Sequence, residues 1–449
     1  MRNVKLGKLW DLLHSSYWFL PTVMAVAAAG LAFLLLAIDS AGSKILSQLT
    51  WLYAGGPEGA RAVLSAVAGS IITVTATAFS ITIVALQLAS SNFGPRLLRT
   101  FMQDTGNQVV LGTFIGTFIY CLLVLRTIHG EDYQLFVPQL SVTVAIGLAI
   151  TSVGVLIYFI HHAATIIQVS HVIANVSEDL EQAIDRVFPE TLGQSASDQH
   201  LVSKIPTDFD AEAHPLNATK TGYLQAIDDQ KLMQLADNHR LLLRLQIRPG
   251  QFVVKGSELL QVYPRDRITP AFVKHLNDAF LLGHERTEQQ DVEFPIDQLV
   301  EIALRAISPA VNDPFTAIRC IDRLGAGLAH LATRNFPSPH RYDKTHTLRV
   351  IAEPVTFEQL VDAAFNQIRH YGRSDADVTI RLLDAIALVA HHTHHSTQQT
   401  VLQRHADMIL RGSQEGLAEE LDRQALQERY YRATKALKQP QESCKSKSF

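Results

Sequence analysis

The stretch RAISPAVNDPFTA, residues 305 to 317, places charged, amide and hydroxyl side chains around two prolines in a region of helical periodicity. The residue before a proline is pushed out of helical geometry, so the Ser-Pro step ends one helix. The Asp-Pro step begins the next helix, because Asp is a favoured N-cap and proline suits the first helical position. Helix N-termini attract anions, so the corner predicts an anion-binding or gating site to which the nearby ERTEQQD segment contributes. The predicted polar corner consists of Arg286, Asp291, Arg305, Ser308, Asn312 and Asp313.

A second interpretation of this corner is purely structural. Arg305 and Asn312 would then bond to backbone groups inside the turn. A hydrolase needs a nucleophile beside a base, and Ser308 has no evident partner in the sequence. No phosphate-binding glycine loop, nucleophile elbow or dinucleotide fingerprint is recognisable along the chain. We therefore expect neither enzyme activity nor a bound cofactor.

Histidines cluster in VAHHTHHSTQQTVLQRHADMI, residues 389 to 409. His391 and His395 would lie one turn apart on a predicted helix, as two zinc ligands can. No carboxylate or cysteine completes a ligand set nearby, which favours a solvated helix surface, and a pH-sensing role is a third interpretation. The cysteines, Cys121, Cys320 and Cys444, are too widely spaced for a zinc site or a disulfide framework, which suits a reducing environment for the soluble part.

Hydroxyl and amide side chains also recur along the apolar run from 62 to 89 and just beyond it. With Val84 completing the series, their spacing alternates between three and four residues, which places them on one side of a helix. Lipid offers no hydrogen-bond partner, so this stripe must face protein or water. Packing against neighbouring helices is one interpretation, and a water-lined path formed by several copies is the other. The polar stripe consists of Ser70, Thr73, Thr77, Ser80, Gln87 and Ser91.

Basic side chains would border such a path at both ends, with Arg61 at one of them. Arg96 and Arg99 follow the stripe and would lie at its cytoplasmic mouth. Basic mouths favour anions. Glu58, at the opposite end of the same segment, weakens that preference.

Four apolar runs are each long enough to cross a hydrocarbon core of about 30 Å. The first is too long for a signal peptide and lacks a cleavage pattern, so we expect it to be retained. Lys and Arg in the flanking loops favour N- and C-termini in the cytoplasm, and Trp and Tyr near span ends suit interfacial belts. The third run contains GTFIG, residues 112 to 116, whose glycines permit close helix packing. These runs predict a transmembrane domain over residues 1–165 with spans at about 18–38, 62–89, 109–125 and 137–160.

The rest of the chain predicts a cytoplasmic α+β domain. Residues 166–219 predict a helical extension of the fourth span and then a linker. Residues 220–265 predict a small β-rich subdomain, and RPGQFVVKGSELLQVYP within it resembles the hairpins of barrel-sandwich modules. Residues 266–437 predict a mainly helical region, and 438–449 a disordered tail. The expected helices there are 270–282, 295–307, 314–333, 356–371, 376–396, 398–412 and 415–437, with a strand in 346–354.

Three segments together carry a family resemblance: IALRAISPAVNDPFTAIRCID at 302–322, AFSITIVALQLASSNFGPRLLRTFMQD at 78–104 and RTEQQDVEF at 286–294. The chain resembles a family of bacterial inner-membrane proteins that is catalogued as a domain of unknown function. Ala310 and Val311 depart from the family pattern, where we expect Gly and Ile or Leu. The resemblance implies a multi-span membrane part with a cytoplasmic C-terminal domain, and it implies no activity.

Two functions are compatible with these features. The first is a homo-oligomeric channel or transport protein for small ions, with the second span lining the axis and the cytoplasmic domain forming a vestibule or gate. The alternative is a membrane-anchored regulatory or scaffold protein that binds a cytoplasmic partner. The small net charge of −4 argues against nucleic acid as a partner.

Overall fold

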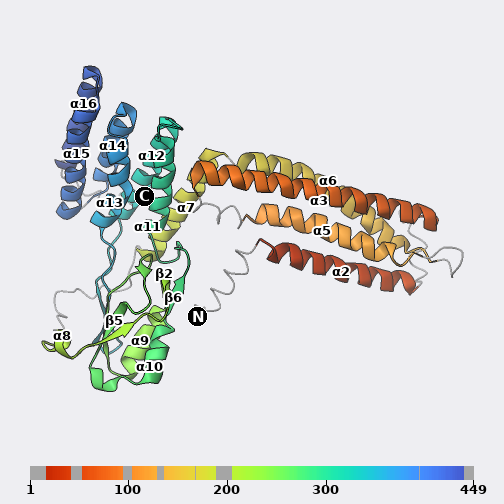
Figure 1. The fold of residues 1–449 in the computed structure, drawn as a ribbon, viewed down its shortest axis with the longest axis horizontal. Coiled ribbons are helices and arrows are strands. Elements are labelled where there is room, and N and C mark those ends of the chain that lie inside the picture. The colour runs from red at the N-terminus through yellow and green to blue at the C-terminus, as the bar shows by residue number, and fades with distance from the viewer. Residues whose placement is uncertain are drawn as a thin grey trace, which may run out of the picture. The chain divides into compact units, whose positions relative to one another are not determined.

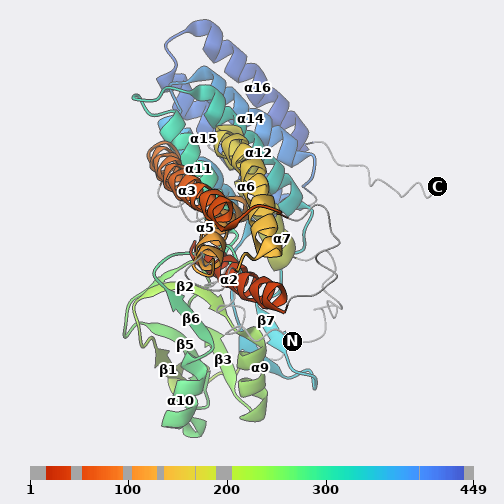
Figure 2. The ribbon, with the colours of Figure 1, turned by 90° about the vertical axis from the view of Figure 1, so that its right-hand side faces the viewer.

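The structure, a computed structural model, describes residues 17–41, 53–94, 104–128, 136–166, 168–188, 205–393 and 395–438. The chain divides into two compact units, residues 1–171 and 172–449. The first contains four helices long and apolar enough to span a membrane, and the second combines helices with two small sheets (Figure 1, Figure 2). The predicted fold class, four membrane helices followed by a mixed and mainly helical region, is confirmed.

The membrane unit is built around its third span. This helix, α5, packs against each of the other three, whereas few direct contacts join α2 to α3 among the described residues. The GTFIG motif permits the closest approach: a Cβ at Gly112 would lie 3.2 Å from the Cα of Pro21, and one at Gly116 would lie 3.3 Å from the Cβ of Ala28. The motif therefore packs α5 against α2. The four helices are α2 (Phe19–Ser40), α3 (Pro57–Phe93), α5 (Thr105–Leu125) and α6 (Gln139–Ile166).

Helix α3 is longer than the predicted span of 62–89 at both ends. Pro57 at the first helical turn and Glu58 beside it favour this earlier start, because both suit a helix N-terminus. At 1.5 Å per residue the helix extends about 55 Å, more than a hydrocarbon core of about 30 Å. One or both ends of α3 therefore reach beyond the hydrocarbon.

A carboxylate at the end of α2 joins the first span to the fourth. Asp39 accepts hydrogen bonds from the backbone N–H groups of Leu140 and Ser141, at 3.1 and 2.9 Å, and from the Ser141 hydroxyl at 2.7 Å. It thus caps the N-terminus of α6, where a negative charge is favourable. The predicted first span stopped at residue 38 and missed this link.

Helix α7 (Val169–Val187) is separate from α6, so the predicted helical extension of the fourth span is broken near residue 168. It is anchored on α12 (Pro314–Ala332) of the second unit, where Leu180 reaches within 2.6 Å of the position that a Cβ on Gly327 would occupy. Asp185 on α7 also pairs with His330 and Arg334. These contacts explain why α7 belongs to the second unit.

Two sheets form the β-rich part of the second unit. The first has five strands in the order β1-β5-β3-β8-β7, and the second has three in the order β4-β2-β6. Strand β3 pairs with β8 in parallel, and the other pairs are antiparallel. The strands are β1 (His214–Asn217), β2 (Gly222–Ile227), β3 (Leu242–Leu245), β4 (Phe252–Val253), β5 (Glu258–Tyr263), β6 (Phe280–Gly283), β7 (His340–Tyr342) and β8 (Leu348–Ile351).

These sheets differ from the predicted subdomain of 220–265 in both membership and pairing. Strand β1 falls in the predicted linker and pairs with β5, while β6, β7 and β8 come from beyond residue 265. Strands β4 and β5 lie in different sheets, so the expected barrel-sandwich hairpin is not formed. The predicted helix 270–282 ends at Asn277, because Phe280–Gly283 pairs with β2.

The remaining helices form a bundle in which α12 packs on α11 and α14, and α14 packs on α15 and α16. The predicted helix 376–396 ends at Ala390, and residues 391–395 turn into the next helix. The predicted tail lies outside the described residues from 439 onward. The helices of the second unit other than α7 and α12 are α8 (Phe209–Glu212), α9 (Asp229–Asn238), α10 (Pro270–Asn277), α11 (Glu293–Ala306), α13 (Phe357–Tyr371), α14 (Ala376–Ala390), α15 (Ser396–Gly416) and α16 (Glu420–Lys438), with a short 3-10 turn at Arg265–Arg267.

Candidate functional site

The polar stripe of α3 lies on the side of the helix that the other described elements leave uncovered. Ser70, Thr73, Thr77, Ser80, Gln87 and Ser91 are all exposed. The opposite side of α3 holds the buried residues, among them Leu64, Ala68 and Ile71, which join the cores of the membrane unit. Packing against another helix of the same chain therefore does not account for the stripe.

The hydroxyl groups of the stripe use their own helix as hydrogen-bond acceptor. Thr73 donates to the carbonyl of Gly69 at 3.0 Å, Thr77 to that of Thr73 at 3.1 Å, and Ser80 to that of Ala76 at 2.9 Å. Each hydroxyl proton is engaged, so the oxygen presents its acceptor lone pairs outward. A row of outward-facing oxygen acceptors results.

The stripe is more polar than the other exposed surfaces of the membrane unit, although Val84, which lies between Ser80 and Gln87, is 58% exposed. A Cβ at Gly69, within the stripe, would meet nothing within 4 Å. By contrast, α2 exposes Val26 and Phe33, and α6 exposes Ile150 and Ile157, each with more than half of its surface accessible. Large apolar side chains suit contact with lipid, whereas small and hydroxyl-bearing side chains are typical of contacts between membrane helices.

The charges near the ends of α3 have distinct environments. Glu58 is exposed and lies in the first turn of α3, twelve residues before Ser70 and about 120° from it around the helix. Arg61 donates to the carbonyl of Ile128 at 2.8 Å, in the segment that follows α5. Arg96 and Arg99, the predicted cytoplasmic mouth, lie outside the described residues.

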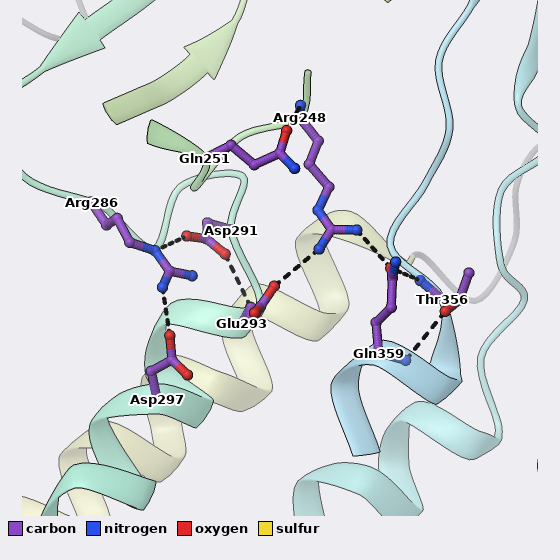
Figure 3. Close-up of polar contacts among 8 residues, drawn as sticks. All are labelled: Arg248, Gln251, Arg286, Asp291, Glu293, Asp297, Thr356 and Gln359. Carbon is purple, nitrogen blue, oxygen red and sulfur yellow. Dashed lines mark hydrogen bonds and ion pairs between the residues drawn. The ribbon is translucent and has the colours of Figure 1, made fainter. Parts of the chain in front are cut away.

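A network of charged side chains surrounds the start of α11 in the second unit (Figure 3). Arg286 donates to Asp291 at 2.7 Å and to Asp297 on the first turns of α11. Asp291 is only 4% exposed, and it also accepts from the backbone N–H of Glu293 at 3.1 Å. Burial raises the pKa of Asp291 above its ordinary value, and the hydrogen bond from Arg286 opposes that rise. Arg286 is thus the counterion of a buried carboxylate.

The second half of this network joins the loop before β4 to two helix N-termini (Figure 3). Arg248 pairs with Glu293 of α11 at 3.2 Å and donates to Gln359 of α13 at 2.6 Å. Gln359 also completes a capping box with Thr356. Burial raises the pKa of Glu293, and the nearby Asp297 adds to the rise. The arginines Arg248 and Arg286 therefore connect the strand region to the helical bundle.

The remaining members of the predicted polar corner lie at the other end of α11. Asp313 accepts from the backbone N–H of Thr316 at 3.2 Å and caps α12, as predicted. Ser308 donates to the carbonyl of Arg305 at 2.6 Å, and Asn312 has a left-handed backbone with φ of 49°. At 1.5 Å per residue α11 separates these groups from Arg286 and Asp291 by about 20 Å. The structure therefore divides the predicted corner between two places, and Arg305 pairs with Glu301 of α11 at 3.3 Å.

His391 and His395 do not share a helix face, which corrects the premise of the predicted zinc pair. His391 follows the last residue of α14, and His395 precedes the first residue of α15. Among the described residues no group of three or more His, Cys, Asp or Glu side chains is arranged to hold a metal ion. His405 is fully buried and bonds to Asp362 at 2.8 Å, and burial lowers the pKa of His405 despite that carboxylate.

Several partners in these contacts had no signal in the sequence. Arg248, Glu293 and Asp297 were not predicted as site residues, since their partners come from different elements of the fold. Asp39 has a local signal, because it directly follows an apolar span. Only the structure shows that Arg61 bonds to the carbonyl of Ile128.

Four long apolar helices with a mixed helical and β-sheet unit define the chain as an α-helical membrane protein. It belongs to the DUF2254 family of predicted membrane proteins, which matches residues 14–388, in agreement with the predicted resemblance. It is 34% identical over 435 residues to the uncharacterised protein Rv1290c of Mycobacterium tuberculosis, covering 96% of this chain and 82% of the relative. The uncharacterised protein Mb1321c of Mycobacterium bovis has the same identity and coverage. No solved structure matches the chain.

Proposed function

We propose that this membrane protein self-associates around an axis lined by α3 and conducts small ions, with cations preferred. The observation that carries the proposal is the exposed polar stripe on α3, which no other described part of the chain covers. A polar surface in a membrane needs protein or water beside it. Copies of α3 around a common axis supply both, and the cytoplasmic unit then acts as a vestibule or gate.

The preference for cations rests on the chemistry of the stripe. Its threonine and serine hydroxyls donate to their own helix, so their oxygens remain as acceptors toward the axis. Oxygen acceptors suit cations, and a ring of Glu58 carboxylates at one mouth adds the charge that cation channels use. Arg61 does not oppose this ring directly, because its guanidinium is bound to the carbonyl of Ile128.

Passive conduction is favoured over proton-coupled transport. Coupling to protons commonly uses an ionisable side chain within the membrane. The carboxylate of Asp39 is bound to the N-terminus of α6, and the stripe itself contains no ionisable residue. The proposal therefore requires no conformational cycle of the four helices.

The test is conductance of the purified full-length protein in planar bilayers. Thr77→Leu and Ser80→Leu each remove an oxygen from the stripe and should lower single-channel conductance severalfold. Thr151→Leu is the matched control, because Thr151 is also exposed and also donates to its own helix, at 2.9 Å, but lies on α6. Equal conductance in the wild type and all three variants, or none in the wild type, would reject the proposal.

A scaffold function has one observation in its favour. Val311, Phe315, Tyr371 and Leu421 are 60%, 75%, 66% and 70% exposed and lie in or beside three turns between bundle helices. These turns lie at one end of the bundle, since a Cβ on Gly372 would be 3.6 Å from Ile307 and one on Gly416 would be 2.9 Å from the carbonyl carbon of Arg373. Exposed apolar groups that gather in this way are typical of a protein-binding surface.

The two functions are separable with one substitution. Phe315→Ser should abolish capture of a cytoplasmic partner by a soluble fragment of residues 166–449 if the chain acts as a scaffold. The same substitution should leave bilayer conductance unchanged if the channel proposal holds. Selective capture by the wild-type fragment without ion flux would favour the scaffold.

A further inference from the structure

The membrane unit contains an open cavity of about 510 Å³ between α2, α3 and α5. Its α2 wall includes Ala25 and Ala29, its α5 wall Ile115 and Ile119, and α3 contributes Phe79. The cavity exists because α2 and α3 both pack on α5 but make few contacts with each other, and because alanines leave space between them. All of its walls belong to the membrane-spanning helices.

The lining of this groove is suited to hydrocarbon. Aliphatic and aromatic side chains make up most of its wall, and no charged residue contributes to it. The hydroxyl of Thr22, which also lines the groove, donates to the carbonyl of Trp18 at 2.7 Å and requires no further acceptor. The hydroxyl of Tyr17 is a second polar group in the lining, and the rest of the wall favours an apolar occupant over water.

The groove also has the depth of one lipid leaflet. Its lining on α2 runs from Trp18 to Ala29, a rise of about 17 Å at 1.5 Å per residue. One leaflet is half of a hydrocarbon core of about 30 Å. Trp18 at the end of the groove is 62% exposed, and tryptophan prefers the boundary between hydrocarbon and headgroups. The length of the groove therefore matches one leaflet, with Trp18 suited to the headgroup end.

We infer that this groove holds one acyl chain of a membrane phospholipid, with the headgroup beside Trp18. Hydrocarbon chains are the material that surrounds the spans, and a chain in the groove restores the contacts that α2 and α3 do not make with each other. The site is separate from the polar stripe, because none of the stripe residues lines the groove. The inference therefore stands whether or not the protein conducts ions.

The test uses photo-crosslinking of the full-length protein in phosphatidylglycerol vesicles that contain a phospholipid with a diazirine on its acyl chain. Crosslinked residues are identified by mass spectrometry. In the wild type, labelling should be about tenfold higher at groove residues such as Ala29 and Ile119 than at Ile150 and Ile157, which α6 exposes to lipid. Equal labelling at the two sets of positions would overturn the inference.

Two matched variants separate a filled groove from ordinary contact with surrounding lipid. Ala25→Trp places an indole in the groove and should reduce labelling of Ile119 to the level of Ile157. Ala27→Trp is the control, because Ala27 is exposed on the same helix and does not line the groove. Unchanged labelling of Ile119 in a folded Ala25→Trp variant would also overturn the inference. If Ala25→Trp does not fold, the labelling ratio in the wild type still decides.

Discussion

Gly250 lies so close to Asp291 that a Cβ at position 250 would stand 2.6 Å from the carboxylate carbon. Its φ of +92° is also one that L-residues rarely adopt. The turn before β4 is thus fitted against a buried carboxylate whose counterion, Arg286, also holds the start of α11. The strand region and the helical bundle are joined here, so substitutions among these residues should be costly.

Gly250→Ala should lower the free energy of unfolding by about 3 kcal/mol, through backbone strain and overlap with Asp291. Gly256→Ala is the matched control, because Gly256 has the same φ of +92° but open space around it. Gly256→Ala should lower the free energy of unfolding by about 1 kcal/mol, because only the backbone strain at positive φ applies there. Thermal unfolding in detergent measures both. Equal losses would show that contact with Asp291 does not constrain the turn.

Arg286→Gln should destabilise the protein by about 3–5 kcal/mol at neutral pH, because Asp291 would then be a buried charge without its counterion. Loss of Arg286 removes an influence that lowers the pKa of Asp291, so that pKa should rise further. The free energies of unfolding of the variant and the wild type should therefore become more similar as the pH falls and Asp291 becomes protonated. Glu420→Gln, which removes the exposed partner of Arg423, should change nothing measurable. A difference in the free energy of unfolding between Arg286→Gln and the wild type that does not depend on pH would contradict this account.

Asp179→Asn should stabilise the protein at neutral pH. Burial, together with the charges of Glu288 and Glu178, raises the pKa of Asp179 to about 6. The folded state therefore binds a proton more tightly than the unfolded state, and the stability of the wild type falls as the pH rises from about 4 to about 6. Asparagine cannot ionise, so the variant does not lose this stability. The expected difference in the free energy of unfolding is about 1 kcal/mol after allowing for solvent screening. Unfolding temperatures of the two proteins should differ at neutral pH and converge near pH 4, and a constant difference would be the contrary result.

Gly69→Leu should weaken self-association without unfolding the monomer. A side chain at position 69 meets nothing in the chain itself, so a loss of assembly reports a neighbouring copy. Gly147→Leu on α6 is the control, because a Cβ there also meets nothing within 4 Å. Mass photometry in detergent gives the distribution of assemblies. The same distribution for both variants would place the contact between copies elsewhere.

Glu58→Gln should reduce the preference for cations over anions, because it removes the carboxylate from the mouth of the proposed path. The reversal potential under a KCl gradient should move toward zero, while Glu58→Asp should keep it close to the wild type. A wild-type protein selective for anions would overturn the cation assignment but leave conduction itself intact. Arg96 and Arg99 would then be the next positions to substitute.

Local signals in the sequence predicted the features that depend on neighbouring residues. Long apolar runs gave all four membrane helices, and Asp313 before Pro314 marked the start of α12 correctly. The segment 270–282 was misassigned in part, because AFLLG has no feature that excludes a helix, and pairing with β2 decides its conformation. Tertiary pairing overrides local preference in such short apolar stretches.

The candidate sites were predictable to a similar extent. Helical periodicity put the stripe residues on one side of α3, but only the packing of the other helices shows that this side is uncovered. The pairing of Arg286 with Asp297 could not be predicted from the sequence, since the two residues lie on different elements. In the sequence, Asp297 is not distinguishable from an exposed charged residue on a helix. The histidine pair was wrongly placed on one helix because the turn after Ala390 has no glycine or proline to mark it.

The parallel pairing of β3 with β8 also bears on synthesis of the chain. Strand β3 is complete at Leu245, but its partner β8 begins at Leu348, roughly 100 residues later, which is about 5–20 s of translation. During that interval one edge of β3 has no partner from its own sheet, and open strand edges are where chains aggregate. A nascent chain released before residue 348 would expose that edge, so a premature stop in this stretch would yield an aggregation-prone membrane protein and not merely a shorter one.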